Sequence, residues 1–389
     1  MKMKPKVAAA LESSLIQHLR LREGVSRVEL ARAMDVAPST VGLYVDRLIR
    51  NGLLREGTKA RGQAGRPPIT LELNPEAGHF VGVDFEARQL SAVAVDFSQQ
   101  ILERRQTSIR ASDTADSVID KINDAITAVA GRRSLLGIGV AVPGSVDDKR
   151  GVALHYQFIR NWRNVPLVRR LRERFNVPIY LENNIRSMAL AERWFGQCMG
   201  VDDFVCVGIR SGIGAGVVIK GELYRGKNNL AGEIGGWYRG CDGDGAEGFA
   251  TLEQQASVRA ILAQIAEAAA AGDETTLKLR AGQPAALEDV LPAARAGDPL
   301  VLRVLRRAAT SLGQVIGQMN LLLSPEQIVI AGPLAELGSA FLDPMREVVA
   351  RLAPPLHAEP PRIVASQLGD YGGALGAAAI AVHQFMPAR

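Results

Sequence analysis

From residue 80 onward, strand-length apolar runs alternate with helical segments, and this order constrains the fold more than any other feature of the chain. The first set consists of short strands at 80–85, 90–96 and 101–109, an amphipathic helix at 115–129 and an apolar strand at 136–142. The second set consists of strands at 204–208, 214–219 and 327–331 and helices at 300–323 and 372–383. Two α/β lobes of this kind enclose a cleft, which is a natural site for a small molecule.

The first 75 residues differ from the rest in charge. They hold 13 Lys and Arg against 7 Asp and Glu, a net charge of +6, whereas the remaining chain holds 33 against 34, a net charge of −1. A small basic head on a neutral body indicates a polyanion-binding module joined to another domain, although an ordinary solvated surface has a similar composition.

Three helices are predicted in this head. Residues 7–22 carry an apolar stripe at helical spacing, the segment 26–34 opens with a capping box of Ser26 and Glu29, and a third helix follows Pro38. A helix, a short turn and a second helix form the geometry that places the second helix in a DNA major groove. The residues of this helix expected to contact DNA are Ser39, Thr40, Tyr44 and Arg47.

A hairpin is predicted after the third helix. Its strands lie at 53–56 and 69–73, and the segment 57–68 between them has three cations and no apolar residue larger than alanine or proline. Such a hairpin is a wing, and its Gly-Arg-Pro core suits the minor groove of A·T-rich DNA, where negative potential attracts arginine. We therefore expect Arg61 and Arg66 to contact DNA, with a flexible solvated loop as the alternative.

Seven motifs in the body carry a family resemblance. They are AVPGSV at 141–146, NWRNVPL at 161–167, LENN at 181–184, SGIGAG at 211–216, GELYRG at 221–226, LAGEIG at 230–235 and LGDYGGALGAA at 368–378. In order and spacing they resemble the signatures of the ROK family (repressors, uncharacterised reading frames, sugar kinases), and the likeness runs from about residue 10 to 385. The head resembles that of the NagC/XylR-type regulators in this family, which repress sugar-use genes and respond to a sugar or sugar phosphate.

The resemblance implies an α/β fold in two domains. A winged helix-turn-helix DNA-binding domain is expected over residues 1–74. A two-lobed, actin-like ATPase (ROK sugar-kinase-like) domain that binds the effector and dimerises is expected over 75–389, with lobes at about 75–180 and 181–389.

Two positions that ROK kinases use for phosphoryl transfer differ here. Those kinases open with Asp-x-Gly-Gly-Thr, whose glycines let backbone N–H groups approach phosphate, but residues 84–88 read DFEAR. Phe85 and Glu86 are expected to crowd and repel a polyphosphate. The family's catalytic base is the Asp of a Glu-Asn-Asp motif, and Asn184 at this position cannot hold a proton near neutral pH. The resemblance therefore implies a regulator without enzymatic activity.

Arg210 replaces a family glycine in front of the second glycine-rich loop. Its guanidinium either fills the vacant nucleotide cleft or points outward to solvent, and the sequence leaves both possibilities open.

The zinc site of the family is not expected in this chain. Gly236 stands at the position of a family His, and of three family cysteines only Cys241 remains, so the four ligands of tetrahedral zinc are lacking. Asp242, Asp244 and Glu247 lie in the same loop but do not have the spacing of an EF-hand. We predict a metal-free loop and no cofactor.

Residues able to bind a sugar are nevertheless retained. Asn183 matches the middle residue of Glu-Asn-Asp, Glu233 the Glu of Gly-Glu-Ile-Gly-His, and Glu253 the Glu after the cysteine cluster. Asn184 still donates and accepts hydrogen bonds, and Gly144 belongs to the first motif. Together these five form the expected ligand site. A buried cap or a salt bridge is the alternative role for the polar side chains.

Three other residues near the motifs are weaker candidates. Trp237, next to Gly236 at the family His position, is a candidate to stack on a sugar face. Arg160 or Arg163 is a candidate to hold a phosphate, although a surface position is favoured for both arginines.

These features predict a DNA-binding transcriptional regulator, most simply a repressor of carbohydrate-use genes whose operator affinity is controlled by a sugar or sugar derivative. One winged helix reads a half-site, so a homodimer on a palindromic operator is expected, with a tetramer also possible. A sugar kinase with an accessory DNA-binding head and a constitutive DNA-binding protein with an inactive cleft remain alternatives. The start lacks the apolar core of a signal peptide and no run of 18 apolar residues occurs, so a cytoplasmic protein without membrane contact is expected.

Overall fold

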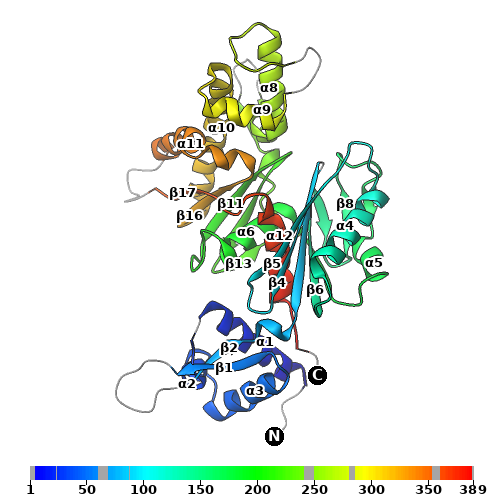
Figure 1. The fold of residues 1–389 in the computed structure, drawn as a ribbon. Coiled ribbons are helices and arrows are strands. Elements are labelled where there is room, and N and C mark those ends of the chain that lie inside the picture. The colour runs from blue at the N-terminus through cyan, green and yellow to red at the C-terminus, as the bar shows by residue number, and fades with distance from the viewer. Residues whose placement is uncertain are drawn as a thin grey trace.

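The computed structural model describes residues 5–22, 24–59, 69–86, 88–240, 249–279, 285–352 and 360–387. Figure 1 shows a small N-terminal head and two larger α/β lobes, each lobe built on a five-stranded sheet. The mixed α/β class expected from the order of strands and helices is confirmed.

The head contains a helix-turn-helix. Its described elements are α1 (Pro5–Leu21), α2 (Arg27–Ala33), α3 (Pro38–Arg50), β1 (Leu54–Lys59) and β2 (Ile69–Leu73), with β1 antiparallel to β2. The Ser26 N–H donates to the Glu29 carboxylate at 2.8 Å and the Ser26 hydroxyl accepts from the Glu29 N–H, which is the predicted capping box. Pro38 lies in the first turn of α3, where the missing N–H removes no helical hydrogen bond.

The first lobe has a mixed sheet with the strand order β10-β6-β3-β4-β5. Its elements are β3 (His79–Phe85), β4 (Gln89–Asp96), β5 (Ile101–Ser108), α4 (Ala115–Ala130), β6 (Leu135–Val142) and β10 (Ile179–Asn183). A small antiparallel sheet of β7 (Ser145–Asp147), β8 (Val152–His155) and β9 (Arg163–Val165) and the helix α5 (Leu167–Arg172) complete it. Every residue of β3 is buried, because helices cover both faces of the sheet at this central strand.

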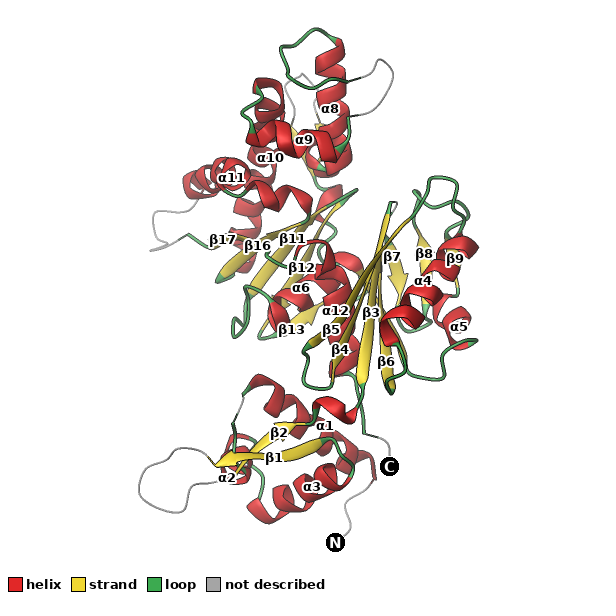
Figure 2. Ribbon diagram, viewed as in Figure 1, coloured by secondary structure: helices red, strands yellow, loops and turns green. Residues whose placement is uncertain are grey.

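The second lobe has the strand order β13-β12-β11-β16-β17 (Figure 2). Its strands are β11 (Phe204–Ile209), β12 (Ile213–Ile219), β13 (Glu222–Tyr224), β16 (Gln327–Ala331) and β17 (Arg362–Ala365), with a short pair β14 (Tyr238–Gly240) and β15 (Phe249–Thr251). Its helices are α6 (Asn184–Phe195), α7 (Leu252–Ala256), α8 (Val258–Ala270), α9 (Leu287–Arg295), α10 (Pro299–Leu323) and α11 (Ser339–Leu352). Although α10 has 25 residues, no helix in the described part of the chain is apolar enough over a sufficient length to cross a membrane.

The C-terminal helix α12 (Gly372–His383) connects the parts of the molecule, and Figure 1 shows it between the two lobes. It packs against α6, β3 and β6. Two of these contacts bring backbone against backbone: a Cβ at Gly139 would lie 1.8 Å from the Ala377 oxygen, and one at Gly376 would lie 1.7 Å from the Ser187 oxygen. Only glycine permits this approach, so the glycines of these two segments fix the position of α12.

The head is docked on the end of α12 by side chains from one face of α1. The donors and their main-chain carbonyl acceptors are Ser13 to Phe385 (3.4 Å), Gln17 to His383 (3.1 Å) and Arg20 to Val382 (2.9 Å). The acceptors Val382 and His383 lie in the last turn of α12 and Phe385 lies just beyond it, so α1 binds the head to this end of the helix. Burial lowers the pKa of Arg20 to about 9, and its guanidinium also lies over the Phe97 ring.

We expect Gly376→Ala to lower the free energy of unfolding by about 3 kcal/mol or more, because the new methyl group meets the fixed Ser187 carbonyl. Chemical denaturation followed by circular dichroism measures this loss. The matched control is Gly42→Ala in α3, where the added Cβ has nothing within 4 Å and should stabilise the helix by about 0.5–1 kcal/mol. Equal effects of the two substitutions would contradict the close packing of α12.

Candidate functional site

A cavity of about 310 Å³ lies between the two lobes, and residues from both of them line it. This volume is at the lower end of the range for small-molecule sites in proteins. The five residues selected from the sequence as ligand contacts all line it: Gly144, Asn183, Asn184, Glu233 and Glu253. The fold thus brings together side chains from four separate segments of the chain. Ligand binding by these residues stays a prediction.

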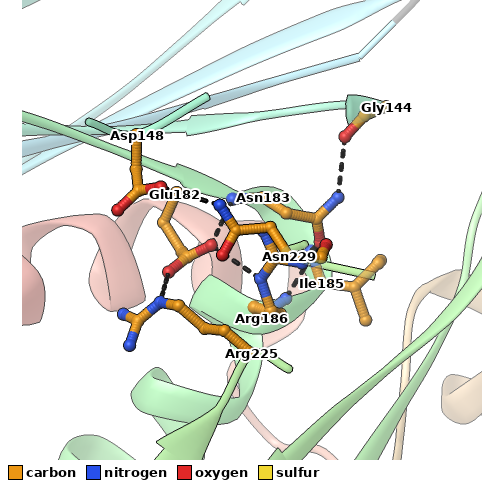
Figure 3. Close-up of polar contacts among 8 residues, drawn as sticks. All are labelled: Gly144, Asp148, Glu182, Asn183, Ile185, Arg186, Arg225 and Asn229. Atoms are coloured by element: carbon orange, nitrogen blue, oxygen red, sulfur yellow. Dashed lines mark hydrogen bonds and ion pairs between the residues drawn. The ribbon is translucent and has the colours of Figure 1, made fainter. Parts of the chain in front are cut away.

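Asn183 lines the cavity and also begins α6. Its Oδ1 accepts hydrogen bonds from the N–H groups of Ile185 (2.9 Å) and Arg186 (3.2 Å), and its Nδ2 donates to the Gly144 carbonyl (3.0 Å), as Figure 3 shows. This is an N-cap, the structural role named above as an alternative. The side-chain oxygen is committed to the helix, which leaves the second N–H of the amide for a ligand.

A buried ion network fixes the first turn of α6 (Figure 3). Glu182 is 2% exposed, and its two carboxylate oxygens each accept at 2.7 Å, one from Arg186 and one from Arg225. Arg186 also donates to the Asn229 carbonyl, and the Asn229 amide donates to Asp148, both at 2.8 Å. A carboxylate can be buried this deeply when both oxygens are paired. Sequence reasoning missed this network, although the i, i+4 spacing of Glu182 and Arg186 was a visible signal.

Two carboxylates in the cavity belong to the second lobe. Burial raises the pKa of Glu233, the positive charge of Arg186 opposes this change, and the charge of Glu253 adds to it. Glu253 accepts a hydrogen bond from the Ile213 N–H at 3.2 Å, which ties it to the glycine-rich loop before β12. Each carboxylate has further lone pairs with which to accept hydrogen bonds from hydroxyl groups.

Gly144 has a backbone conformation that favours glycine. Its φ is +72°, and a Cβ there would lie 2.3 Å from the His155 oxygen. The turn therefore brings the backbone of the first motif directly against the end of β8. His155 is in the cavity wall as a result.

Several wall residues were not selected from the sequence as ligand contacts. They are Glu86, Pro143, Ser145, the segment 155–158, Ile185, Arg186, the segment 211–215, Ala231 and Gly232. Most of them come from loops whose positions follow from the packing of both lobes, which local patterns do not encode. Trp237, Arg160 and Arg163 are not among the lining residues, so the expected stacking of Trp237 on a sugar in this cavity is wrong.

Arg210 points inward, which settles the choice that the sequence left open. Its Nη1 lies 2.8 Å from Asp84 and its Nε 3.4 Å from Glu86, and its side chain is 15% exposed. Burial raises the pKa of Asp84 to about 6, while the Arg210 charge acts to lower it. Burial alone would lower the pKa of Arg210, but the charges of Asp84 and Glu86 raise it above its ordinary value.

The space beside this ion pair is nearly filled. A cavity of only about 50 Å³ remains there, between Arg210, Asp84 and the turns at Gly332 and Gly373. This is several-fold smaller than the usual small-molecule site.

The expectation that Phe85 crowds the phosphate region is wrong. Successive side chains of a strand point to opposite faces of the sheet, so Phe85 points away from the face that Asp84 occupies. It is fully buried, with its ring centroid 4.9 Å from that of Trp162. Glu86 does lie at the cleft, where it lines the larger cavity and pairs with Arg210.

The zinc ligands of the family do not fit this chain at the His position. Gly236 has no side chain, and its ideal Cβ position has no heavy atom within 4 Å. Within the described ranges no group of three or more His, Cys, Asp or Glu could hold a metal ion. Cys241 and the rest of 241–248 lie outside the described residues, so the metal-free loop stays a prediction.

The outer face of α3 differs from the expected one. Ser39 is exposed and Thr40 is half-buried, but Tyr44 is 7% exposed and lies in the core of the head, so its expected place on the outer face of α3 is wrong and its contact with DNA stays a prediction. Arg47 is partly exposed and forms an ion pair at 3.2 Å with the buried Glu12 of α1. Helical periodicity explains the error, because Tyr44 follows Val41 by one turn on the inward stripe.

Leu43, Asp46 and Arg50 are also exposed on α3. Leu43 is 62% exposed, and an exposed apolar side chain on such a helix can contact a thymine methyl group. Arg61 and Arg66 lie outside the described residues, so their contacts with DNA stay predictions.

The comparisons with known proteins agree on one family. A model of the ROK family matches residues 80–384. The xylose repressor of Bacillus spizizenii (strain ATCC 23059 / NRRL B-14472 / W23) is 27% identical over 382 residues, which cover 96% of this chain and 94% of its own. The DNA-binding transcriptional dual regulator NagC of Escherichia coli (strain K12) is 28% identical over 362 residues, which cover 92% of this chain and 88% of its own.

Solved structures give the same result for the fold. A ROK family transcriptional regulator, a homologue of the E. coli MLC protein, superimposes with a TM-score of 0.82 at 23% identity and covers 97% of both chains. A ROK family glucokinase from Streptomyces griseus, in complex with glucose and AMPPNP, has a TM-score of 0.69 at 29% identity and covers 78% of this chain and 99% of its own.

We expect Arg210→Ala to lower the free energy of unfolding by about 3 kcal/mol near pH 8, because Asp84 and Glu86 lose their buried partner. The loss should be smaller near pH 5. The folded-state pKa of Asp84 is already raised, and it rises further without Arg210. The variant therefore keeps its stability at low pH, where Asp84 is protonated, and loses stability as the pH rises from the ordinary carboxyl pKa to the raised folded-state pKa. Urea titrations at the two pH values measure both quantities.

The control for this prediction is Arg295→Ala, which removes an exposed ion pair with Glu336 and should cost less than about 0.5 kcal/mol at either pH. An Arg210→Ala loss as small as that of the control, or one independent of pH, would contradict the inward ion pair.

Proposed function

The chain belongs to the ROK family, and on this premise we propose that it is a DNA-binding transcriptional repressor of carbohydrate-use genes. Its operator affinity is controlled by a sugar or sugar derivative that binds in the cavity between the lobes. We assign DNA binding to residues 1–74 and effector binding and dimerisation to residues 75–389.

One observation carries this proposal: a single pair of packed helices connects the cavity to the head. The first residues of α6 line the cavity. Helix α6 packs along α12, and α1 of the head donates hydrogen bonds to carbonyls in the last turn of α12 and just after it. A change in the relative position of the lobes is therefore communicated to the orientation of α3.

The head supports recognition of double-stranded DNA. It combines a helix-turn-helix with a basic segment between β1 and β2. One such head reads a half-site, so we propose a homodimer on a palindromic operator. The relatives named xylose repressor and N-acetylglucosamine repressor support a carbohydrate effector.

The cleft supports a regulator rather than a kinase. Asn184 stands where ROK kinases place the catalytic Asp, and an amide cannot accept the proton of the attacking hydroxyl. The Arg210 guanidinium lies against Asp84 in the region where such kinases need open glycine backbone for phosphate, and little space remains beside it. Phosphoryl transfer is therefore disfavoured at two separate points.

The DNA claim is tested with full-length protein and a duplex selected from a random pool. We expect Arg66→Ala to reduce affinity about 10-fold and to reduce the slope of log affinity against log salt by about 1, because one phosphate contact is lost. Fluorescence anisotropy across a salt series measures both quantities, and Arg132→Ala, an exposed arginine in the first lobe, is the matched control. An unchanged affinity and slope would remove the wing from the proposed interface.

The kinase alternative is tested by incubating the purified protein with MgATP and D-glucose, D-xylose or N-acetyl-D-glucosamine. We expect no sugar phosphate by mass spectrometry. Asn184→Asp restores the family base but should remain inactive, because Arg210 still occupies the phosphate region. Turnover by the wild-type protein would contradict the proposal, and turnover by Asn184→Asp alone would show that the loss of the base is the sole block.

A further inference from the structure

We propose that the effector of this protein is an uncharged, unphosphorylated sugar, and that the cavity discriminates against the corresponding sugar phosphate. This inference rests on the proposed function of the same cavity. It follows from the charges in the wall and from how the nearby arginines and the first N–H groups of α6 are already used.

The wall of the cavity is acidic. Three carboxylates line it, those of Glu86, Glu233 and Glu253. Arg186 is the only lysine or arginine among the described residues in the wall. A phosphate carrying up to two negative charges would be placed among carboxylates in a partly desolvated site, where like charges repel more strongly than in water.

The one arginine in the wall is not free to compensate a phosphate. Arg186 is 3% exposed, and its Nε donates to Glu182 while its Nη1 donates to the Asn229 carbonyl. A phosphate paired with Arg186 would compete for its charge with Glu182, a buried carboxylate whose other partners are Arg225 and the Asn183 N–H. The network in Figure 3 therefore holds Arg186 in place for a structural reason.

Arg210 is also committed elsewhere. Its guanidinium lies between Asp84 and Glu86, and it lines the small cavity of about 50 Å³ rather than the larger one. Releasing it toward a phosphate would leave Asp84, which is 2% exposed, without its cation. Of the three carboxylates in the wall, Glu86 is the one paired with Arg210, so Glu233 and Glu253 dominate the charge that a ligand meets.

Two N–H groups at the start of α6 are committed as well. The N-terminus of a helix attracts phosphate through its unpaired N–H groups. Here the N–H groups of Ile185 and Arg186 already donate to the Asn183 side chain. The remaining polar side chains of the wall are carboxylate, amide and hydroxyl groups and the imidazole of His155, all of which can form hydrogen bonds with the hydroxyl groups of a sugar.

The experiment compares each free sugar with its phosphate on the full-length protein by isothermal titration calorimetry. The pairs are D-xylose and D-xylose 5-phosphate, D-glucose and D-glucose 6-phosphate, and N-acetyl-D-glucosamine and its 6-phosphate. We expect at least one free sugar to bind about 100-fold or more tightly than its phosphate.

Two variants assign the discrimination to the carboxylates. Glu253→Gln keeps a hydrogen-bonding side chain of the same size but removes the charge. It should weaken binding of the free sugar and lower the ratio of free-sugar affinity to sugar-phosphate affinity about 10-fold. Glu233→Gln is the second variant. It is included because Glu253→Gln alters the hydrogen bond between Glu253 and the Ile213 N–H and could disturb the fold. The control is Glu347→Gln, an exposed glutamate of α11, which should leave the ratio unchanged.

The outcomes separate the two claims. Binding of a sugar phosphate as tightly as its free sugar, or an unchanged ratio in both cavity variants, would overturn the charge discrimination and leave the proposed function standing. Absence of binding by every free sugar and every phosphate, with DNA binding intact, would overturn the proposed effector function itself.

Discussion

Helix α12 lies against β6 and α6 at a distance that admits no side chain, and this contact positions the two sites that matter for function. With hydrogen as the only side chain at Gly139 and Gly376, the three elements meet through their backbones. Packed backbones have little freedom to slide, so α6 and α12 behave as one body. One end of this body places Asn183 and Asn184 at the cavity, and the other offers the carbonyls that Ser13, Gln17 and Arg20 of the head bind. Continuity of the apolar core from α1 and α3 into β3 and α12 strengthens the connection.

The charges of the cleft differ from those that a phosphoryl-transfer site needs. A kinase must keep its phosphate region open and supply a cation when the nucleotide arrives. Here Arg210 supplies a permanent cation, and Asp84 and Glu86 hold it without a ligand. The buried pair need not increase stability over an apolar alternative, since desolvation opposes the Coulomb attraction. Its consequence is local: the region is nearly filled and the Arg210 cation is already paired, while the larger cavity next to it stays open.

Much of this architecture could be predicted from the sequence, and the misses have a common physical origin. The order of strands and helices, the capping box of Ser26 and the five cavity residues follow from local patterns and from motifs. The inward position of Arg210 does not, because it depends on a carboxylate more than 120 residues away in the chain. Phe85 and Tyr44 were misplaced because the face of an element on which a residue lies is set by its register against the core. Trp237 sits beside a motif residue, but adjacency in sequence does not decide which way a side chain points.

Control of DNA binding by a ligand requires that the ligand bind two arrangements of the protein with different affinities. The cavity meets this requirement because its wall is divided between the lobes: Gly144 belongs to the first, whereas Glu233 and Glu253 belong to the second. A ligand that contacts both sides favours one spacing of the lobes over any other. Moving an equilibrium from 1:99 to 99:1 takes a preference of about 10⁴-fold, which corresponds to a few well-placed hydrogen bonds in a desolvated site. Since α12 lies between the lobes and its end is bound by α1, the proposed function has the spacing selected by the ligand also select the orientation of the head. In a homodimer the separation of the two recognition helices is then set by the cavity, although no ligand contact lies on the head itself.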